Sequence, residues 1–269
     1  MDIVKSKKEI KRVKTYIEGL DENLEGGIPE GHIVIINGAS GTMKSSISFN
    51  VLYNRVINGS TVLYATLEQS SASIIKHMVN MDFDMSKINL HIISDISKIE
   101  KDLKSIKSSR KGSLIMADLG AVRKQTKNTK FFSSTVWLDA IKNLVTRVTG
   151  ATDCKIFVLD SLSALYALSE FKEPRKELFY IFEFLRNFNL TSFLISETPF
   201  DKSNLAQFSV EESLADGIIR LKLTERYRKV TREFSIAKMR ATNCNLDIFT
   251  LEYKNKKFYA LYGGKIPVI

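Results

Sequence analysis

The stretch that decides the fold of this 269-residue chain is Gly38-Ala39-Ser40-Gly41-Thr42-Met43-Lys44-Ser45. The β-branched run Ile33-Val34-Ile35-Ile36 comes shortly before it and is typical of a buried strand that ends at Gly38. From Ser45 onward, apolar residues recur at helical spacing until Asn58-Gly59, a pair that commonly ends helices. The stretch is therefore predicted to connect a buried strand to a helix.

This connection resembles the G-x-x-x-x-G-K-[ST] pattern of phosphate-binding loops. Small residues let backbone N–H groups point inward at phosphate oxygens, and the start of the helix adds a partial positive charge. We expect Lys44 to reach the β- and γ-phosphates of a nucleotide, and the hydroxyl of Ser45 to ligate Mg²⁺. The predicted nucleotide-binding residues of the loop are Ala39, Ser40, Gly41, Thr42, Met43, Lys44, Ser45 and Ser46.

Met43 departs from the pattern, which has glycine at this position. If the position requires a positive φ, methionine costs of order 1 kcal/mol there. If the position already has helical φ and ψ, the cost is small. The sequence leaves both alternatives open.

Acidic residues follow two other predicted strands. Asp160 closes the apolar run Ile156-Phe157-Val158-Leu159, which suits an acid that holds Mg²⁺ through its water shell. Glu68 follows the predicted strand 61–66 and suits a general base for the attacking water. Because ligands of parallel sheets bind at the carboxyl ends of the strands, we expect both acids near Gly38. Ser196-Glu197-Thr198 ends a further strand and is a candidate sensor of the γ-phosphate.

Strands and helices alternate along most of the chain. Besides the elements above, the patterns predict strands at 91–93, 113–117 and 192–195 and helices around 74–78, 137–148 and 178–188. After Pro199 they predict short strands at 218–223, 233–237, 248–251 and 258–261, and no helix. The lysine- and serine-rich segment 98–111 has little core potential, and 120–132 is predicted to be a loop. The fold class is therefore α/β, a mainly parallel sheet flanked by helices with extra antiparallel C-terminal strands, in one domain spanning 1–269.

The composition indicates the compartment and the kinds of partner to expect. The two cysteines, Cys154 and Cys244, exclude a disulfide framework and a four-cysteine zinc site, and fit a reducing compartment. No apolar run is long enough to span a membrane, and no apolar segment follows the basic start at Met1, so we expect a cytoplasmic protein without a membrane partner. The net charge of +10 favours anionic partners, although lysines on solvated helix faces explain most such excesses.

Taken together, the motifs resemble the KaiC-like branch of the RecA-type ATPases, in particular the archaeal single-domain members. The resemblance covers nearly the whole chain and implies a RecA-like P-loop core, ATP and Mg²⁺ as ligands, and a homo-oligomeric ring, usually a hexamer, with ATP between neighbouring subunits. It is carried, besides the P-loop, by Thr15-Tyr16-Ile17-Glu18-Gly19-Leu20-Asp21, Gly26-Gly27-Ile28-Pro29-Glu30-Gly31, Asp160-Ser161-Leu162-Ser163-Ala164-Leu165, Glu211-Glu212-Ser213-Leu214-Ala215-Asp216 and Lys238-Met239-Arg240.

The resemblance assigns roles to single residues. Members of the family place a Lys-x-Arg pair against the ATP of the adjacent subunit, and Lys238 and Arg240, with Met239 between them, match that pair. Both cations would neutralise transition-state charge in trans, as arginine fingers do. The resemblance also implies that Asn80 lies near the adenine. Members carry two glutamates after the second strand, and here the pair is Glu68-Gln69, so one catalytic carboxylate is kept and slow hydrolysis is expected.

Two further positions differ from the family pattern. A histidine often follows the Lys-x-Arg pair, and here its position falls on Cys244, which puts that contact in doubt. The autophosphorylating clock domain has a Ser-Thr pair before the aspartate that matches Asp216, and here Glu212-Ser213 stands in its place. No clock phosphoswitch is predicted, and modification of Ser213 alone stays open.

Three functions remain as hypotheses. The leading one is a slowly hydrolysing ring ATPase that acts as a nucleotide-dependent switch or scaffold for a partner protein, in signalling. The second is a DNA recombination or repair ATPase of the RadA type, for which segment 98–111 and the loop 123–127 would supply phosphate contacts, although only about a dozen residues precede the core. The third is a non-catalytic ATP-sensing module, motivated by Met43 and Gln69.

Overall fold

The computed structural model describes residues 10–95, 99–107, 111–120, 136–169, 173–197, 210–226 and 228–262. The first half contains β1 (Arg12–Val13), β2 (Ile17–Glu18), β3 (Ile28–Pro29), β4 (Ile33–Gly38), α1 (Lys44–Ile57), β5 (Thr61–Thr66), α2 (Ser71–Asn80), β6 (Asn89–Ile93), α3 (Ile99–Lys107) and β7 (Ser113–Asp118). The second half contains α5 (Val136–Ala151), β8 (Ile156–Asp160), α6 (Leu162–Ser169), α7 (Pro174–Asn187), β9 (Thr191–Glu197), α8 (Val210–Leu214), β10 (Gly217–Arg226), β11 (Lys229–Met239), β12 (Ile248–Lys254) and β13 (Lys257–Tyr262).

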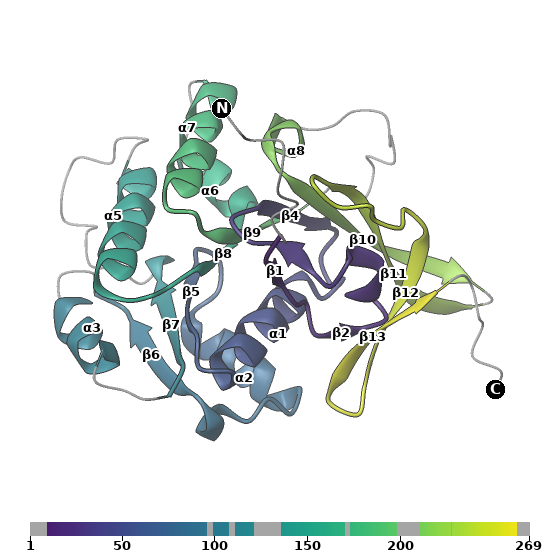
Figure 1. The fold of residues 1–269 in the computed structure, drawn as a ribbon, viewed down its shortest axis with the longest axis horizontal. Coiled ribbons are helices and arrows are strands. Elements are labelled where there is room, and N and C mark those ends of the chain that lie inside the picture. Colours follow the sequence, from purple (N-terminus) through teal and green to yellow (C-terminus); the bar gives the residue numbers. More distant parts are fainter. Residues whose placement is uncertain are drawn as a thin grey trace.

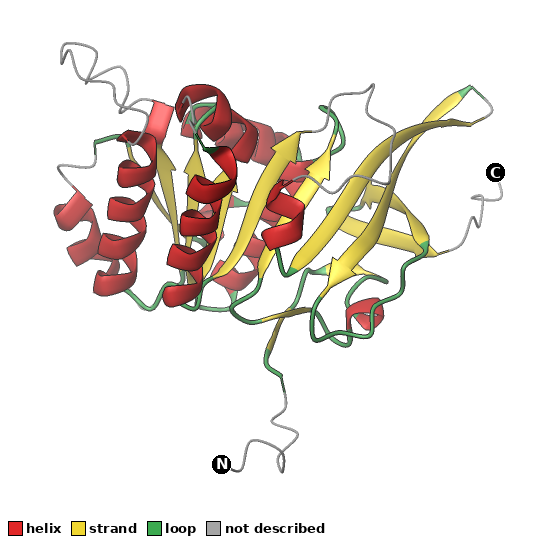
Figure 2. Cartoon of the chain, turned by 90° about the horizontal axis from the view of Figure 1, so that it is seen from above, coloured by secondary structure: helices red, strands yellow, loops and turns green. Residues whose placement is uncertain are grey.

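An eleven-stranded sheet in the order β2-β13-β12-β11-β10-β4-β9-β8-β5-β7-β6 runs through the molecule. The strands from β10 to β6 are parallel, and β10 to β13 form an antiparallel meander beside them. The helices gather over the parallel part, while the antiparallel strands extend beyond them (Figures 1 and 2). The expected α/β class, with a mainly parallel sheet and antiparallel C-terminal strands, is confirmed.

Helices cover both faces of the parallel strands, and each face has its own core. Every residue of β5, β7 and β8 is buried, as expected for parallel strands covered on both sides. Successive residues alternate between the faces, so Tyr64 and Val158 join the core beneath α1 and α2, whereas Leu63 and Phe157 join the core beneath α3, α5, α6 and α7.

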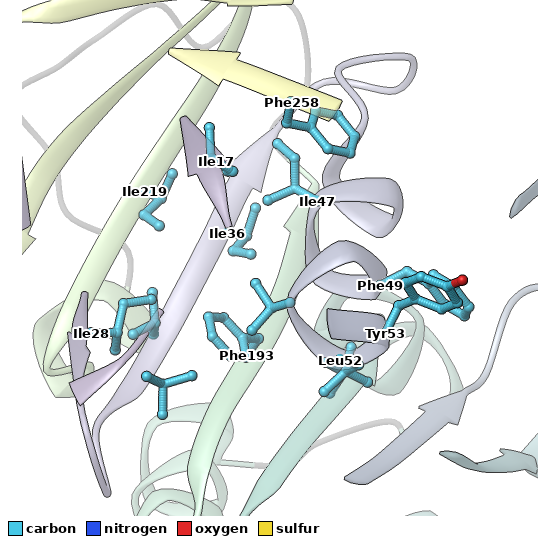
Figure 3. Close-up of a cluster of buried hydrophobic side chains, with 14 of the residues drawn as sticks. Ile17, Ile28, Ile36, Ile47, Phe49, Leu52, Tyr53, Phe193, Ile219 and Phe258 are labelled. Carbon is cyan, nitrogen blue, oxygen red and sulfur yellow. The ribbon is translucent and has the colours of Figure 1, made fainter. Parts of the chain in front are cut away.

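The core beneath α1 continues under the antiparallel strands. Ile47 and Leu52 of α1 lie against Ile36 of β4 and Phe193 of β9, and Phe258 of β13 closes the cluster (Figure 3). Each side chain buried in this way stabilises the fold by about 1.5–3 kcal/mol before entropy is counted. This packing fixes α1, and with it the loop before α1, against the centre of the sheet.

Two expectations about secondary structure were wrong. The segment 98–111 contains helix α3, whose Ile99, Leu103 and Ile106 are buried at helical spacing, so its lysines hid an apolar stripe. A short helix, α8, follows Pro199, where none was expected. The expected loop at 120–132 and the basic loop 123–127 lie outside the described residues, apart from Gly120. Among the helices that the structure describes, no helix is long and apolar enough to cross a membrane.

Candidate functional site

The loop between β4 and α1 lies at the carboxyl edge of the parallel strands. Gly38 pairs with Glu197 of β9 and Leu221 of β10 and needs to be glycine, because a Cβ there would lie 2.5 Å from the carbonyl oxygen of Leu221. Gly41 and Met43 both have positive φ, 80° and 72°. Left-handed residues at these positions turn backbone N–H groups toward one concave side, as an anion-binding loop requires.

Met43 therefore adopts the left-handed conformation, the costlier of the two alternatives that the sequence left open. Its side chain packs against the core beneath α1, which offsets part of the strain. The helix starts at the next residue, Lys44. The missing glycine is thus replaced by a residue held in the glycine conformation, and the course of the loop is kept.

The ammonium group of Lys44 is folded across its own loop. Its Nζ donates to the carbonyl oxygens of Gly38 at 2.8 Å and Ala39 at 2.9 Å, and lies 3.3 Å from Oε1 of Glu197. The lysine is 7% exposed, whereas the Glu197 side chain is 44% exposed. Two carbonyl oxygens and a carboxylate hold the cation at the place where phosphate oxygens would replace them.

The hydroxyl of Ser45 meets the acid at the end of β8. Ser45 Oγ donates to Oδ2 of Asp160 at 2.7 Å, and the hydroxyl of Tyr64 donates to the same oxygen at 2.5 Å. Burial raises the pKa of Asp160, although the hydrogen bonds from Tyr64 and Ser45 and the charge of Lys44 oppose this shift. Burial together with the charge of Asp160 holds the pKa of Tyr64 well above 10, so Tyr64 acts as a neutral donor.

These residues fit a bound Mg²⁺. A serine hydroxyl and a carboxylate are hard oxygen ligands, and Mg²⁺ is usually held by one or two such groups together with phosphate oxygens and water. Among the described residues, no cluster of three or more His, Cys, Asp or Glu side chains forms a metal site. The hydroxyl of Ser45 and the carboxylate of Asp160 thus match this kind of ligand set.

Glu68 lies in the turn between β5 and α2, which is also at the carboxyl edge of the parallel strands. Thr66 pairs with Asp160, so the turn that follows β5 lies beside the end of β8. The Glu68 carboxylate accepts a hydrogen bond from Ser161 Oγ, which also accepts one from the N–H of Ala164. Ser161 thus holds the carboxylate of Glu68 in place. Because Glu68 is exposed, the carboxylate remains accessible to water.

Other contacts hold the turn that carries Glu68. Thr66 Oγ1 donates to the carbonyl oxygen of Gln69 at 2.7 Å, and Oδ2 of Asp118 accepts from the N–H of Ser71 at 3.3 Å. Asp118 ends β7 and is buried, so it caps the start of α2 from beneath the turn. The position of Glu68 is thus set by three parallel strands.

Lys238 and Arg240 lie near the amino ends of the parallel strands, opposite the loop that carries Lys44. Arg240 donates its backbone N–H to the carbonyl oxygen of Asp216, which is level with Ile33 at the amino end of β4. At about 3.3 Å per residue, Ile33 lies roughly 17 Å from Gly38. Lys238 Nζ donates to the carbonyl oxygen of Ala215 at 2.6 Å. Neither cation is brought to the loop of its own chain, as the expected role in trans requires.

Asp216 organises this basic edge. Its Oδ1 accepts from Arg240 at 2.7 Å and lies 3.4 Å from Arg186, while Oδ2 accepts from the N–H of Ile33 at 3.1 Å. Burial alone would raise the pKa of Asp216, but the hydrogen bonds from Ile33 and Arg240 and the charge of Arg186 lower it overall. Arg240 is half-exposed, and its ion pair with the ionised Asp216 holds its side chain at the surface.

The remaining predicted residues lie around these two edges. Thr42 is buried, and its hydroxyl donates to the carbonyl oxygen of Ala39. Ser40 is exposed at the tip of the loop. Ser46 is buried, and its Oγ lies 3.3 Å from Nε2 of His77. Asn80 is the exposed last residue of α2. The side chain of Met239 is buried in the core beneath α1.

Three residues that touch the site were not predicted from the sequence. Tyr64 was counted only as part of a strand, Ser161 only as part of a family motif, and Arg232 was not considered. Arg232 extends from β11 and donates Nε to the carbonyl oxygen of Gly41 at 3.1 Å, so it lies over the tip of the loop. Its place beside Gly41 depends on the pairing of β10 with β4, which local sequence does not show.

The fold and the site together define a P-loop ATPase core of the RecA type. The family model described as the KaiC ATPase matches residues 13–259, and the chain belongs to this family. A UPF0273 protein of Thermotoga maritima is 28% identical over 261 residues, covering 95% of this chain and 99% of the relative. A UPF0273 protein of Saccharolobus solfataricus is 30% identical over 240 residues, covering 88% of this chain and 78% of the relative.

Two further comparisons connect the chain to named KaiC proteins. The circadian clock oscillator protein KaiC 1 of Synechocystis is 24% identical over 88% of this chain, which spans only 41% of that protein. The crystal structure of a KaiC-like protein from Pyrococcus horikoshii has a TM-score of 0.68 at 24% identity, covering 93% of this chain and 99% of the other. The resemblance stated from the motifs is confirmed.

Proposed function

We propose that this chain binds and hydrolyses ATP with Mg²⁺ at the carboxyl edge of its parallel sheet. One observation carries the proposal: β4, β5 and β8 bring Lys44, Glu68 and Asp160 to the same edge, with the hydroxyl of Ser45 on the Asp160 carboxylate. These are the cation, the general base and the metal-holding acid that phosphoryl transfer to water requires.

Each residue has a distinct task. Lys44 exchanges the carbonyl oxygens of Gly38 and Ala39 for phosphate oxygens and neutralises their charge. Ser45 would ligate Mg²⁺ and Asp160 would hold it through its water shell, and the metal would supply positive charge that neutralises the phosphates. Glu68, oriented by Ser161, accepts a proton from the attacking water.

The same proposal includes assembly and regulation. ATP sits between neighbours in a ring of six subunits, where Lys238 and Arg240 of one subunit reach the phosphates bound by the next. The distance between Arg240 and the loop of its own chain supports this role. Gln69 replaces the second acid beside Glu68, which supports slow turnover and hence a switch or scaffold for a partner protein in signalling.

Calorimetry and phosphate release test the chemistry. Wild-type protein should bind ATP with Mg²⁺, and Glu68→Gln should keep this binding while phosphate release falls about 10²–10⁴-fold. The control is Glu100→Gln, which neutralises an exposed glutamate of α3, a helix that packs beside the outermost strand β6. Equal rates in wild type and Glu68→Gln would refute the base assignment, and tight binding without any turnover would favour the ATP-sensing alternative.

Single-stranded DNA distinguishes the switch from the recombination alternative. The basic loop 123–127 lies outside the described residues, and α3 uses its apolar stripe for the core. We expect negligible DNA binding at low salt with or without ATP. ATP-dependent affinity that falls steeply with rising salt would favour the recombination ATPase.

A further inference from the structure

Tyr64 crosses the core to reach the acid of the proposed metal site. The residue lies in β5, and its side chain is fully buried. Its ring packs 6.5 Å, between centroids, from that of Phe49 in α1, and its hydroxyl contacts Oδ2 of Asp160. A phenylalanine would fill the same space, so the hydroxyl requires an explanation beyond packing.

The strand register fixes this contact. Tyr64 in β5 lies directly opposite Val158 in β8, and Asp160 lies two residues further along on the same face. Diagonal neighbours on adjacent strands lie within reach of an aromatic side chain. The contact therefore joins two central strands of the sheet and does not depend on the conformation of a loop.

Both hydroxyl groups converge on one oxygen of the acid. Within the described residues, the hydrogen bonds of the Asp160 carboxylate, from Tyr64 and from Ser45, fall on Oδ2. Two donors orient the carboxylate plane and largely occupy the lone pairs of that oxygen, which leaves Oδ1 to accept hydrogen bonds from metal-bound water.

We propose that Tyr64 is a positioning residue for Mg²⁺, whose hydroxyl orients the Asp160 carboxylate toward the water shell of the metal. This inference rests on the proposed function, because it concerns the same site. Partners of this kind typically change metal affinity 10–100-fold when they are removed.

The test compares Tyr64→Phe with wild type and a matched control. Tyr53→Phe removes a hydroxyl from the same core, where it donates to the backbone of Asp84 at 3.0 Å rather than to the metal site. ATP binding is measured by calorimetry in EDTA and over a Mg²⁺ series, at a temperature where thermal unfolding shows all three proteins folded. The release of Mn²⁺, followed by its free-ion EPR signal in the presence of ATP, gives a second readout of the metal.

We expect equal ATP affinity in EDTA for the three proteins, because Lys44 and the loop are unchanged. In Tyr64→Phe, the Mg²⁺ and Mn²⁺ concentrations for half-maximal effect should rise about tenfold or more, and those of Tyr53→Phe should match wild type. An unshifted metal midpoint in Tyr64→Phe, or an equal shift in Tyr53→Phe, would overturn this inference alone. Absence of ATP binding by the wild type would overturn the proposed function and this inference with it.

Discussion

At the scale of single residues, Met43 is the clearest departure from the pattern of its loop. Its φ of 72° is disfavoured for any residue with a Cβ, and strongly so for a β-branched one. Met43→Gly should therefore bind ATP as tightly as wild type, whereas Met43→Val should bind roughly tenfold more weakly, since about 1.4 kcal/mol of strain corresponds to a factor of ten. Titration of the three proteins with ATP checks this, and equal affinities would show that the loop tolerates the strain.

Asp216 makes stability depend on pH at the acidic end. The pKa of Asp216 is lowered in the folded protein. Its contribution to the free energy of unfolding is therefore fully present above its pKa in the unfolded chain, near 3.8, and is lost as the pH falls through its pKa in the folded protein. At pH 7, Asp216→Asn should lower the free energy of unfolding by about 1–3 kcal/mol, because the neutral amide loses the ion pair and has only one oxygen to accept from Arg240 and the N–H of Ile33.

Urea unfolding of wild type and Asp216→Asn at pH 7, 4 and 3 measures this contribution. The difference between the two proteins should shrink below pH 4, while the mutant keeps the acid sensitivity of the other carboxylates. A difference in the free energy of unfolding that is constant from pH 7 to pH 3 would show that the ionised carboxylate of Asp216 does not stabilise the fold.

At the scale of secondary-structure elements, α3 shows how an apolar stripe stabilises a highly charged helix. Leu103 is buried against the core beneath α3, so Leu103→Ala should lower the free energy of unfolding by about 2–5 kcal/mol. Lys104→Ala, on the exposed side of the same helix, should change it by less than about 0.5 kcal/mol. Chemical denaturation of both variants tests the assignment, and similar losses would argue against a buried stripe.

The sequence predicted the elements whose patterns are local. The strands around Ile33 and Ile156 are continuous apolar runs, and the loop at Lys44 has a fixed spacing, so these could be found without a structure. α3 was missed because three lysines and two acidic residues surround its three apolar positions. The hydroxyl of Tyr64 and the contact of Arg232 depend on strand register, which links residues far apart in the chain.

At the scale of the whole molecule, the two edges of the sheet carry complementary halves of one proposed site. Lys44 and Glu68 lie at the carboxyl edge, and Lys238 and Arg240 lie near the amino end of β4. A monomer with this geometry cannot bring its own Arg240 to its own nucleotide, whereas a head-to-tail ring brings opposite edges of neighbours together. We therefore expect the mass in solution to rise to that of a closed ring when ATP and Mg²⁺ are added.

Mixing two inactive variants tests this arrangement directly. Lys44→Ala removes the phosphate-binding cation, and Arg240→Ala removes the cation supplied in trans, so each protein alone should release little phosphate. In rings formed from equal amounts, about one interface in four combines an intact loop with an intact Arg240, so roughly a quarter of the wild-type rate should return if the interfaces act independently. Subunits must be mixed before ATP is added so that hybrid rings form, and mass measurement confirms that they do. No recovery in verified hybrid rings would show that Arg240 does not act across the interface.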